Sequence, residues 1–437
     1  MSKVIDNIED IASIDNHIGL SGITAYHLLQ GNLAVDNTVT TQGFSTTLYT
    51  GNGSTQSINT GIDMDTQWGN DASEKFGGLV WVKSRSDAYN NILSDTINGV
   101  GKYIKSNSTD ALISDATMLT AFNTNGFTSG TNANINGASP RTYASWNFQA
   151  THRTSGTTNH GKAYTCHYNP FTGFTIVKYE GSGIAGHEIP HHLGRKLDLG
   201  FIKNLTDAGQ NWSCTKHSIY LNLTDAGGAI GDTDWAVNSD SNLAINATTS
   251  NINTNAKQYI MYGWANSYFD ENKLIGNYEI GTYQGTGVAG NNVITRGKPA
   301  WVMIKRIDST GNWHICDVLR SNFDARLVAN QSIVESTAYE GFVIGSNYFE
   351  PVYNQSEDNA SGGQYLYMVV YDNDSASGKS KYPRATDTTQ IQLNNAIVPL
   401  ANGIDTNGVK VSTVSKNETV TGVTLTQGKN YIKIKEI

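Results

Sequence analysis

The sequence predicts an all-β protein of tandem β-sandwich repeats, of the jelly-roll type, with a short N-terminal arm that is partly helical. Charged residues make up only 16% of its 437 residues, whereas the chain holds 44 glycines and 22 tyrosines. Glycine and asparagine disfavour helix interiors, and aromatic residues favour strands. A set of landmarks that occurs three times in the same order indicates the repeats.

Each repeat begins with an aromatic residue and a glycine-rich turn. The turn reads "YTGNG" from Tyr49, "YEGSG" from Tyr179 and "YQGTG" from Tyr283. Glycine adopts backbone angles that other residues avoid, so these turns are assigned a structural role. We expect the tyrosine to pack at the edge of a sandwich.

An apolar segment ending in lysine follows each turn, as "GLVWVK", "LDLGFIK" or "PAWVMIK". The repeats close on "TYASWNF", "QYIMYGW" and "QYLYMVVYD". The lysine precedes the first tyrosine of the closing segment by 60, 56 and 60 residues, for the pairs Lys83 and Tyr143, Lys203 and Tyr259, and Lys305 and Tyr365. These matched separations predict equivalent strands in three units.

Two further sets of apolar landmarks support the repeat. An apolar residue follows the lysine by nine, nine and eight positions, at Ile92, Trp212 and Trp313. Within the lysine segments, Trp81 and Trp301 align with Phe201, which indicates a buried aromatic position.

These landmarks divide the chain into six segments. Each repeat of roughly 100 residues is long enough to bury its own core, which predicts three self-contained sandwiches. The predicted segments are an N-terminal docking arm (1–44), sandwich repeat 1 (45–152), a linker (153–171), repeat 2 (172–270), repeat 3 (271–375) and a C-terminal β-segment (376–437).

The two end segments have different patterns. The C-terminal segment contains the expected strands "TQIQLNNAIVPL", "GVKVSTVS", "ETVTGVTL" and "NYIKIKEI". The arm has an apolar stripe, and a second short helix is expected from Ser21 to Leu29, ended by Gly31. The stripe has helical spacing at Val4, Ile5, Ile8, Ile11 and Ala12.

Charge and cysteine content exclude several classes of protein. The net charge of −8 argues against a nucleic-acid partner. No segment approaches the roughly 20 apolar residues that a membrane span needs, and the N-terminus lacks a signal-peptide pattern. Cys166, Cys214 and Cys316 are odd in number and far apart, which predicts synthesis in a reducing cytosol without a disulfide framework.

The densest histidine cluster, "GHEIPHHLGRK", is a weak candidate for a metal site. Zn²⁺ binds histidine and carboxylate ligands, here His187, Glu188, His191 and His192. The cluster lies in a loop and lacks the separate second ligand pair of most zinc sites. "DMDTQWGND", with Asp63 and Asp65, lacks the full Ca²⁺-loop pattern. We therefore expect no metal and no cofactor.

Catalytic residues are not expected either. Cys166 and His167 could form a nucleophilic dyad, but neighbours in an extended chain point to opposite faces. His152 and His160 lie in the same polar stretch. Glycosidases need two carboxylates at a set separation, which the sequence cannot establish for its recurring acidic residues. These are Asp63, Asp65, Asp95, Asp207, Asp225 and Asp317.

Residues 45–375 resemble a repeat family found in structural proteins of marine tailed bacteriophages. The first repeat carries this resemblance in "WVKSRS", "ILSDTINGVGKYIKSNSTDA" and "FNTNGFT", the second in "GFIKN" and "YLNLTDA", and the third in "GNWHICDVLR" and "LVANQS". The resemblance implies concanavalin- or laminin-G-like jelly rolls on a virion, in tail fibres, tail-associated proteins or capsid decorations. It supplies no catalytic residues.

The expected function is therefore that of a non-enzymatic virion surface protein, made in the host cytoplasm and supporting host attachment. We expect a homotrimer that contacts other virion proteins through residues 1–44 and, as a second candidate, through residues 376–437. One alternative is a lectin that binds a host surface glycan in an exposed aromatic groove. Another is a polysaccharide depolymerase with two carboxylates facing each other about 5 to 9.5 Å apart.

Overall fold

The computed structural model describes residues 2–4, 38–41, 43–64, 76–227, 235–270, 273–337, 341–351, 356–372, 390–393, 396–399 and 433–435. Residues 37–373 form one compact unit, here called the body. Residues 1–36 and 374–437 together form a second, here called the terminal unit. The described residues lie mostly in antiparallel strands, which confirms the all-β prediction.

The terminal unit contains two short strand pairs. Strand β1 (Ser2–Val4) pairs with β33 (Lys433–Lys435), and β31 (Gln390–Leu393) pairs with β32 (Ala396–Pro399). Val4 thus lies in a strand and not in the predicted helix. The remainder of that helix, the segment from Ser21 to Leu29, "GVKVSTVS" and "ETVTGVTL" lie outside the described residues.

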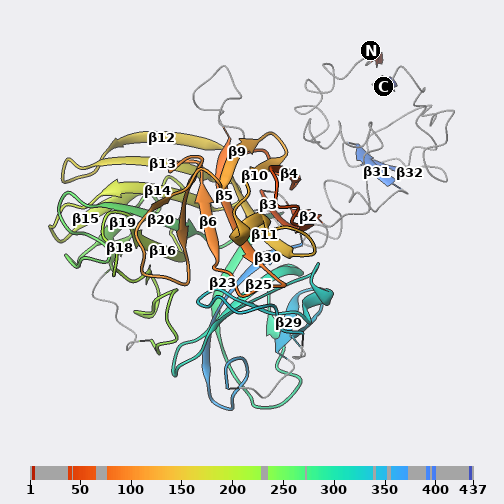
Figure 1. The fold of residues 1–437 in the computed structure, drawn as a ribbon. Helices are drawn as coiled ribbons and strands as arrows, with labels where there is room; N and C mark the ends of the chain where they lie inside the picture. Colours follow the sequence, from red (N-terminus) through yellow and green to blue (C-terminus); the bar gives the residue numbers. More distant parts are fainter. Residues whose placement is uncertain are drawn as a thin grey trace. The chain divides into compact units, whose positions relative to one another are not determined.

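In the body, one arrangement of strands occurs three times (Figure 1). The strand that leads into the aromatic-glycine turn pairs with the last strand of its unit, which pairs with the lysine strand. Unit 1 (38–150) orders its larger sheet as β2 (Thr38–Thr41), β3 (Phe44–Thr50), β11 (Thr142–Ala150), β5 (Gly77–Ser84), β6 (Ile92–Asp95), β7 (Lys102–Lys105) and β8 (Ile113–Ser114). Unit 2 (152–264) has β12 (His152–Thr157), β13 (Ala163–Asn169), β14 (Phe174–Glu180), β20 (Gln258–Trp264), β16 (Leu199–Asn204) and β17 (Ser213–Cys214). Unit 3 (278–372) has β23 (Tyr278–Gln284), β30 (Gln364–Tyr371), β25 (Pro299–Arg306), β26 (Trp313–Asp317) and β27 (Leu327–Val328).

A smaller three-stranded sheet accompanies each larger one, again in one order. Its strands are β4 (Gln56–Asn59), β10 (Gly126–Ser129) and β9 (Leu119–Asn123) in unit 1, β15 (His187–Pro190), β19 (Asn242–Ile245) and β18 (Trp235–Asn238) in unit 2, and β24 (Val293–Ile294), β29 (Tyr348–Pro351) and β28 (Phe342–Ile344) in unit 3. The hairpin of β21 (Tyr268–Asp270) and β22 (Lys273–Ile275) connects units 2 and 3. The described residues also include two short helical turns, α4 (Ala133–Asn136) and η2 (Ser321–Phe323).

The segment predicted as a linker, residues 153–171, belongs to unit 2. Most of it forms the hairpin β12–β13, which adds two strands to the larger sheet beside β14. The aromatic and β-branched residues of "AYTCHYN" suit a strand, and the polar residues that suggested a linker include the hairpin turn.

The strand register places Lys83, Lys203 and Lys305 at one position. In each unit, the residue after the lysine pairs with the first tyrosine of the last strand, as Ser84 with Tyr143, Asn204 with Tyr259 and Arg306 with Tyr365. On its other side, each tyrosine pairs with the tyrosine of the aromatic-glycine turn, as Tyr143 with Tyr49, Tyr259 with Tyr179 and Tyr365 with Tyr283.

This register corrects one aromatic alignment. Trp81 and Phe201 lie two residues before their lysines, where unit 3 has Met303. Trp301 lies four residues before Lys305. Because side chains on a strand alternate between faces, a shift of two residues keeps Trp301 on the same face, so the pattern alone could not detect it. The predicted burial is confirmed, since Trp81, Phe201 and Trp301 are each 1% exposed.

Each larger sheet is buried on both faces. One face contributes to a core confined almost entirely to its own unit. The other face joins a central core shared by all three units, whose largest members include Trp81, Trp146, Trp264, Trp301 and Trp313. The units are therefore not self-contained as predicted, because each leaves a large aromatic face that only the other two units cover.

Equivalent hydrogen bonds connect the units in a closed ring. Three backbone bonds run Leu112 N to Leu205 O (3.2 Å), Gly227 N to Ile307 O (2.6 Å) and Glu335 N to Arg85 O (2.8 Å). Three side-chain bonds run Trp212 Nε1 to Lys105 O (2.8 Å), Trp313 Nε1 to Tyr220 O (3.0 Å) and Asn91 Nδ2 to Val328 O (3.0 Å). Both sets connect unit 1 with 2, 2 with 3 and 3 with 1, which is the pattern of a pseudo-threefold arrangement within one chain.

A buried asparagine fixes each aromatic-glycine turn. The Oδ1 atoms accept from the turn backbone at 2.9 Å, in the pairs Asn136 with Asn52 N, Asn253 with Ser182 N and Asn359 with Thr286 N. The two tyrosines of each unit stack beside the turn, with ring centroids 4.9–5.3 Å apart. A Cβ at Gly51 would overlap the carbonyl oxygen of Gly137. The turn recurs because it docks onto the end of each unit.

The three lysines are completely buried at the unit junctions. Lys203 Nζ donates to Thr109 O of unit 1 (3.1 Å), and Lys305 Nζ donates to Thr224 O of unit 2 (3.2 Å). Lys83 Nζ donates to Ser84 O (2.9 Å). Burial lowers the pKa of each lysine to about 8. Lys203 and Lys305 thus connect neighbouring units, and burial of all three lysines has a cost in desolvation.

Truncating Trp81, Phe201 or Trp301 to alanine should lower the free energy of unfolding by about 3–5 kcal/mol, because each leaves a cavity in the shared core. Urea denaturation should show one transition for the body in each variant. Phe171→Ala is the control, since Phe171 is 62% exposed and its loss should cost less than about 0.5 kcal/mol. Separate transitions for the three units would contradict the shared core.

The buried lysines predict that stability increases between pH 8 and 9.5. Their pKa values are lower in the folded chain than the usual value near 10.4, so in this window the unfolded chain binds more protons. Each lysine should add on the order of 1–2 kcal/mol as the pH rises. Urea denaturation at several pH values should show a slope that is smaller in Lys203→Met than in the unchanged protein. A slope that Lys203→Met leaves unchanged would contradict the assignment.

Candidate functional site: a polar pocket beside a buried charged cluster

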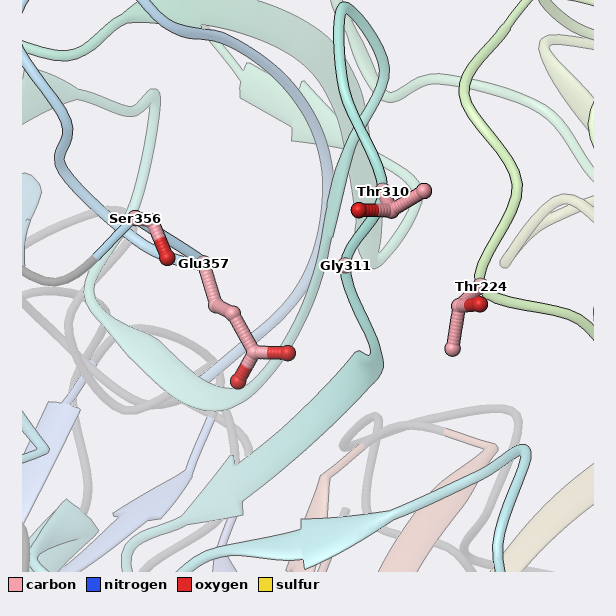
Figure 2. A pocket seen from close by; sticks show the side chains of 5 residues that line it. All are labelled: Thr224, Thr310, Gly311, Ser356 and Glu357. Carbon is pink, nitrogen blue, oxygen red and sulfur yellow. The ribbon is translucent and has the colours of Figure 1, made fainter.

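An open, polar pocket of about 320 Å³ lies where unit 2 meets unit 3 (Figure 2). Unit 2 contributes Thr224, and unit 3 contributes Thr310, Gly311, Ser356 and Glu357. The loop that carries Thr224 is held against unit 3, because its carbonyl oxygen accepts from Gly311 N at 2.9 Å and from the Lys305 ammonium group. The pocket walls are therefore fixed by the ring contacts.

Glu357 is the carboxylate of this pocket and is about one quarter exposed. Its Oε1 accepts from the backbone N (3.2 Å) and the Nδ2 (2.8 Å) of Asn312, and its Oε2 lies 3.1 Å from His314 Nε2. The hydrogen bond from His314 and its positive charge, together with the Asn312 backbone, lower the pKa of Glu357 to about 2. Glu357 is therefore ionised near neutral pH and suited to accepting hydrogen bonds.

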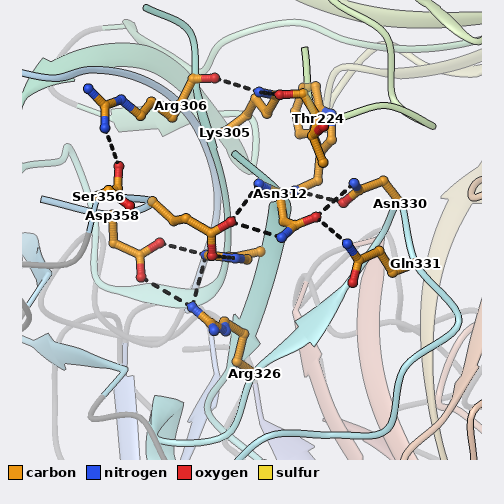
Figure 3. Close-up of polar contacts among 12 residues, drawn as sticks. Thr224, Lys305, Arg306, Asn312, Arg326, Asn330, Gln331, Ser356 and Asp358 are labelled. Carbon is orange, nitrogen blue, oxygen red and sulfur yellow. Dashed lines mark hydrogen bonds and ion pairs between the residues drawn. The ribbon is translucent and has the colours of Figure 1, made fainter. Parts of the chain in front are cut away.

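His314 lies behind Glu357 and is 1% exposed. Its Nδ1 is 2.6 Å from Asp358 Oδ1, and Arg326 Nη1 is 3.4 Å from Asp358 Oδ2 (Figure 3). Burial alone would disfavour the imidazolium form. The carboxylates of Asp358 and Glu357 outweigh that effect and raise the pKa of His314 above its ordinary value. These four residues are here called the charged cluster.

Units 1 and 2 have different residues at the positions of the charged cluster. His314 pairs with the residue before the buried lysine, as do Ile92 and Ser213. Asp358 precedes the turn asparagine, as do Ile135 and Ile252. Glu357 accepts a backbone N–H from Asn312 in the same way that Asn134 accepts from Asn90 and Asn251 accepts from Asn211. The fold requires only the acceptor, so the charges are an addition of unit 3.

The histidines considered as candidate metal ligands do not converge on one site. His187 is buried between Asn253 Oδ1 (2.9 Å) and Thr158 Oγ1 (2.8 Å), and His191 Nε2 lies 3.2 Å from Ser239 O. His192 Nε2 is 3.0 Å from the Tyr164 hydroxyl. Within the part of the chain that the structure describes, no group of three or more histidine, cysteine, aspartate or glutamate residues is placed to hold a metal ion.

Cys166 and His167 lie on opposite faces of β13, as the sequence predicted. Cys166 lies in the core of unit 2, and burial raises its pKa to about 12. His167 Nδ1 is 2.8 Å from Thr96 Oγ1 of unit 1, and burial lowers its pKa to about 4. His152 contacts Thr151, and His160 contacts Ser182. All three cysteines are buried, and none of them forms a disulfide.

The recurring acidic residues are dispersed. Asp95 accepts from the Tyr262 hydroxyl (2.8 Å), and Asp317 accepts from Trp146 Nε1 (3.0 Å), so both join neighbouring units. Asp207 pairs with Lys257, Asp63 is buried and Asp225 is exposed. Asp65 lies outside the described residues.

Sequence reasoning missed the charged cluster and the pocket. The signal was nevertheless present, because a position-by-position comparison of the three repeats shows histidine and aspartate where unit 1 has isoleucine. The signal was obscured because the turn asparagines, which fix that alignment, were not recognised as landmarks.

The stabilising contribution of the charged cluster should be largest between about pH 4.5 and 6.5. The pKa of Glu357 is lower in the folded chain than the usual glutamate value near 4.5, so its stabilising contribution is complete above about pH 4.5. That contribution is lost as the pH falls toward 2. The pKa of His314 is higher in the folded chain than its usual value of 6.5, so its stabilising contribution is complete below pH 6.5. That contribution is lost as the pH rises through the pKa of His314 in the folded chain. Thermal melting as a function of pH measures both limbs.

The acid and alkaline limbs that the cluster contributes should be absent from a variant that restores the residues of unit 1, His314→Ile with Asp358→Ile and Glu357→Asn. Asp240→Asn, at an exposed position of unit 2, is the control and should retain them. An unchanged profile in the triple variant would assign the pH dependence to other groups.

Comparisons with known proteins add one result. None of the helices in the described ranges is long and apolar enough to cross a membrane. Neither a curated protein nor a solved structure matches the chain. A family model described as a domain of unknown function, DUF7483, matches residues 39–373, which correspond to the body. This chain therefore belongs to the DUF7483 family.

Proposed function

We propose that this protein is a non-enzymatic structural protein of a bacteriophage virion, displayed on the particle surface in a tail fibre, a tail-associated position or a capsid decoration. The resemblance of residues 45–375 to virion repeats motivates the proposal. The observation that carries it is the closed ring of three units around one aromatic core. Such a body resists local opening and suits a protein exposed outside the cell.

The chemistry of the pocket supports binding rather than catalysis. A retaining or inverting glycosidase needs an acid and a second carboxylate, about 5 to 9.5 Å apart across the substrate. Among the residues that the structure describes, Glu357 is the single carboxylate lining the pocket, and its lowered pKa keeps it from donating a proton near neutral pH. The carboxylate of Asp358 is engaged by His314 and Arg326. A depolymerase is thus less well supported than a binding protein.

A glycan-binding lectin is the second candidate, and the polar pocket favours it. The described lining of this pocket is threonine, serine, glycine and glutamate, without the exposed aromatic groove expected for a lectin. Host attachment through a surface glycan would therefore depend on hydrogen bonds more than on stacking.

The terminal unit provides the attachment to the particle in this proposal. Residues 1–36 and 374–437 lie outside the body, whose three units form their ring without them. We propose that this unit binds other virion proteins and that the assembly is a homotrimer. Strand β2 belongs to the larger sheet of unit 1, so the docking arm ends before Thr38 and not at residue 44.

Full-length protein should be present on purified virions, and a variant lacking residues 1–36 should be absent from them. A deletion phage is complemented with each form, and particles are analysed by immunoblot and by immunogold labelling. Both purified proteins should retain the thermal transition of the body. Full-length protein that is missing from particles would refute the virion assignment. Full occupancy by the truncated form would transfer the anchor to residues 374–437.

A further inference from the structure

The three unit junctions share a backbone arrangement but differ in chemistry. At the junction of units 1 and 2, Thr109 O accepts from Lys203 Nζ and from Gly209 N. At the junction of units 2 and 3, Thr224 O accepts from Lys305 Nζ and from Gly311 N. The loops are thus equivalent, and Thr224 occupies the position of Thr109.

The side chains facing these equivalent loops are different. Thr310 precedes Gly311, whereas Ala208 precedes Gly209. Glu357 stands where unit 2 has Asn251, and each accepts a backbone N–H from an equivalent asparagine. The junction of units 2 and 3 therefore adds a hydroxyl group and a carboxylate to a framework that does not need them.

We propose that this pocket is a binding subsite for one neutral, hydroxyl-rich sugar residue of a surface glycan. This inference rests on the proposed role in host attachment. The lining presents the hydroxyls of Thr224, Thr310 and Ser356 together with the ionised carboxylate of Glu357. Hydroxyls both donate and accept, and an ionised carboxylate accepts strongly from O–H groups. The volume of about 320 Å³ lies at the small end of the range for ligand pockets, which suits a single ring.

The surrounding charges select against ionic ligands. The Glu357 carboxylate is already paired with His314, and Asn312 donates twice to its Oε1. An ammonium ligand would therefore compete with an existing partner, and the buried Lys305 ammonium group lies beneath the Thr224 loop. An acidic sugar would bring a second carboxylate toward Glu357. A neutral polyol avoids both penalties.

Asn312 positions Glu357 for this role. Its Oδ1 accepts from Asn330 Nδ2 (2.9 Å) and Gln331 Nε2 (2.7 Å), while its Nδ2 donates to Glu357 Oε1 (Figure 3). The carboxylate is thereby held at the pocket wall before any ligand arrives. Such preorganisation reduces the entropy lost on binding.

Saturation-transfer NMR on the full chain tests the proposal. The neutral probes are the methyl glycosides of glucose, galactose and mannose, and the ionic probes are glucuronate and methylammonium. At least one neutral glycoside should bind, with a dissociation constant on the order of 1–10 mM. Thr310→Val and Thr224→Val should each weaken it about three- to tenfold, the effect of losing one hydrogen-bonding hydroxyl.

Thr109→Val is the matched control, because it removes the equivalent hydroxyl at the other junction, and it should leave affinity unchanged. Equal weakening by Thr109→Val and Thr224→Val, binding of only an ionic probe, or no saturable binding by any neutral glycoside would each overturn the subsite. Glycoside binding by a protein missing from virions would refute the virion role alone. A protein that labels virions but binds no glycoside would refute the subsite alone.

Discussion

The aromatic core shared by the three units is the constraint on which the rest of the body depends. Every larger sheet has one face against its own small sheet and one against the other two units, so no unit is complete alone. Burying side chains as large as Trp146 and Trp301 contributes several kcal/mol each, more than any single hydrogen bond in the structure. Three sheets that share one core also contact one another in pairs, which gives the three unit junctions of the ring.

The unit junctions show how polar groups are placed around such a core. Each junction contains a buried lysine and a side-chain N–H group that donates to a backbone carbonyl of the neighbouring unit. These backbone carbonyls are therefore satisfied. Buried polar groups without partners are costly, and lysine is tolerated here because carbonyl oxygens receive its ammonium group. The lowered pKa of these lysines reflects the free-energy cost of burying their charge.

Comparison among the three units separates structural from functional chemistry inside one chain. The turn asparagine, the tyrosine pair and the lysine occur in every unit and hold the fold. His314, Asp358 and Glu357 occur only in unit 3, at positions filled elsewhere by isoleucine, serine or asparagine. Replacing a buried ion pair with apolar packing is often neutral or stabilising, so stability alone does not account for this cluster. The proposed sugar subsite rests on this asymmetry.

The sequence by itself determined the all-β class, the three sets of landmarks and the burial of Trp81, Phe201 and Trp301, because turn glycines and strand aromatics act locally. It also separated Cys166 from His167, since strand alternation is local. Only the tertiary structure decided that residues 153–171 are strands of unit 2 and that Met303, not Trp301, matches Trp81. It alone united the units around a common core and brought Thr224 beside Glu357. The first two features depend on strand pairing and register, and the last two depend on contacts between units, as between Thr224 and Glu357. A linear pattern carries no information on either.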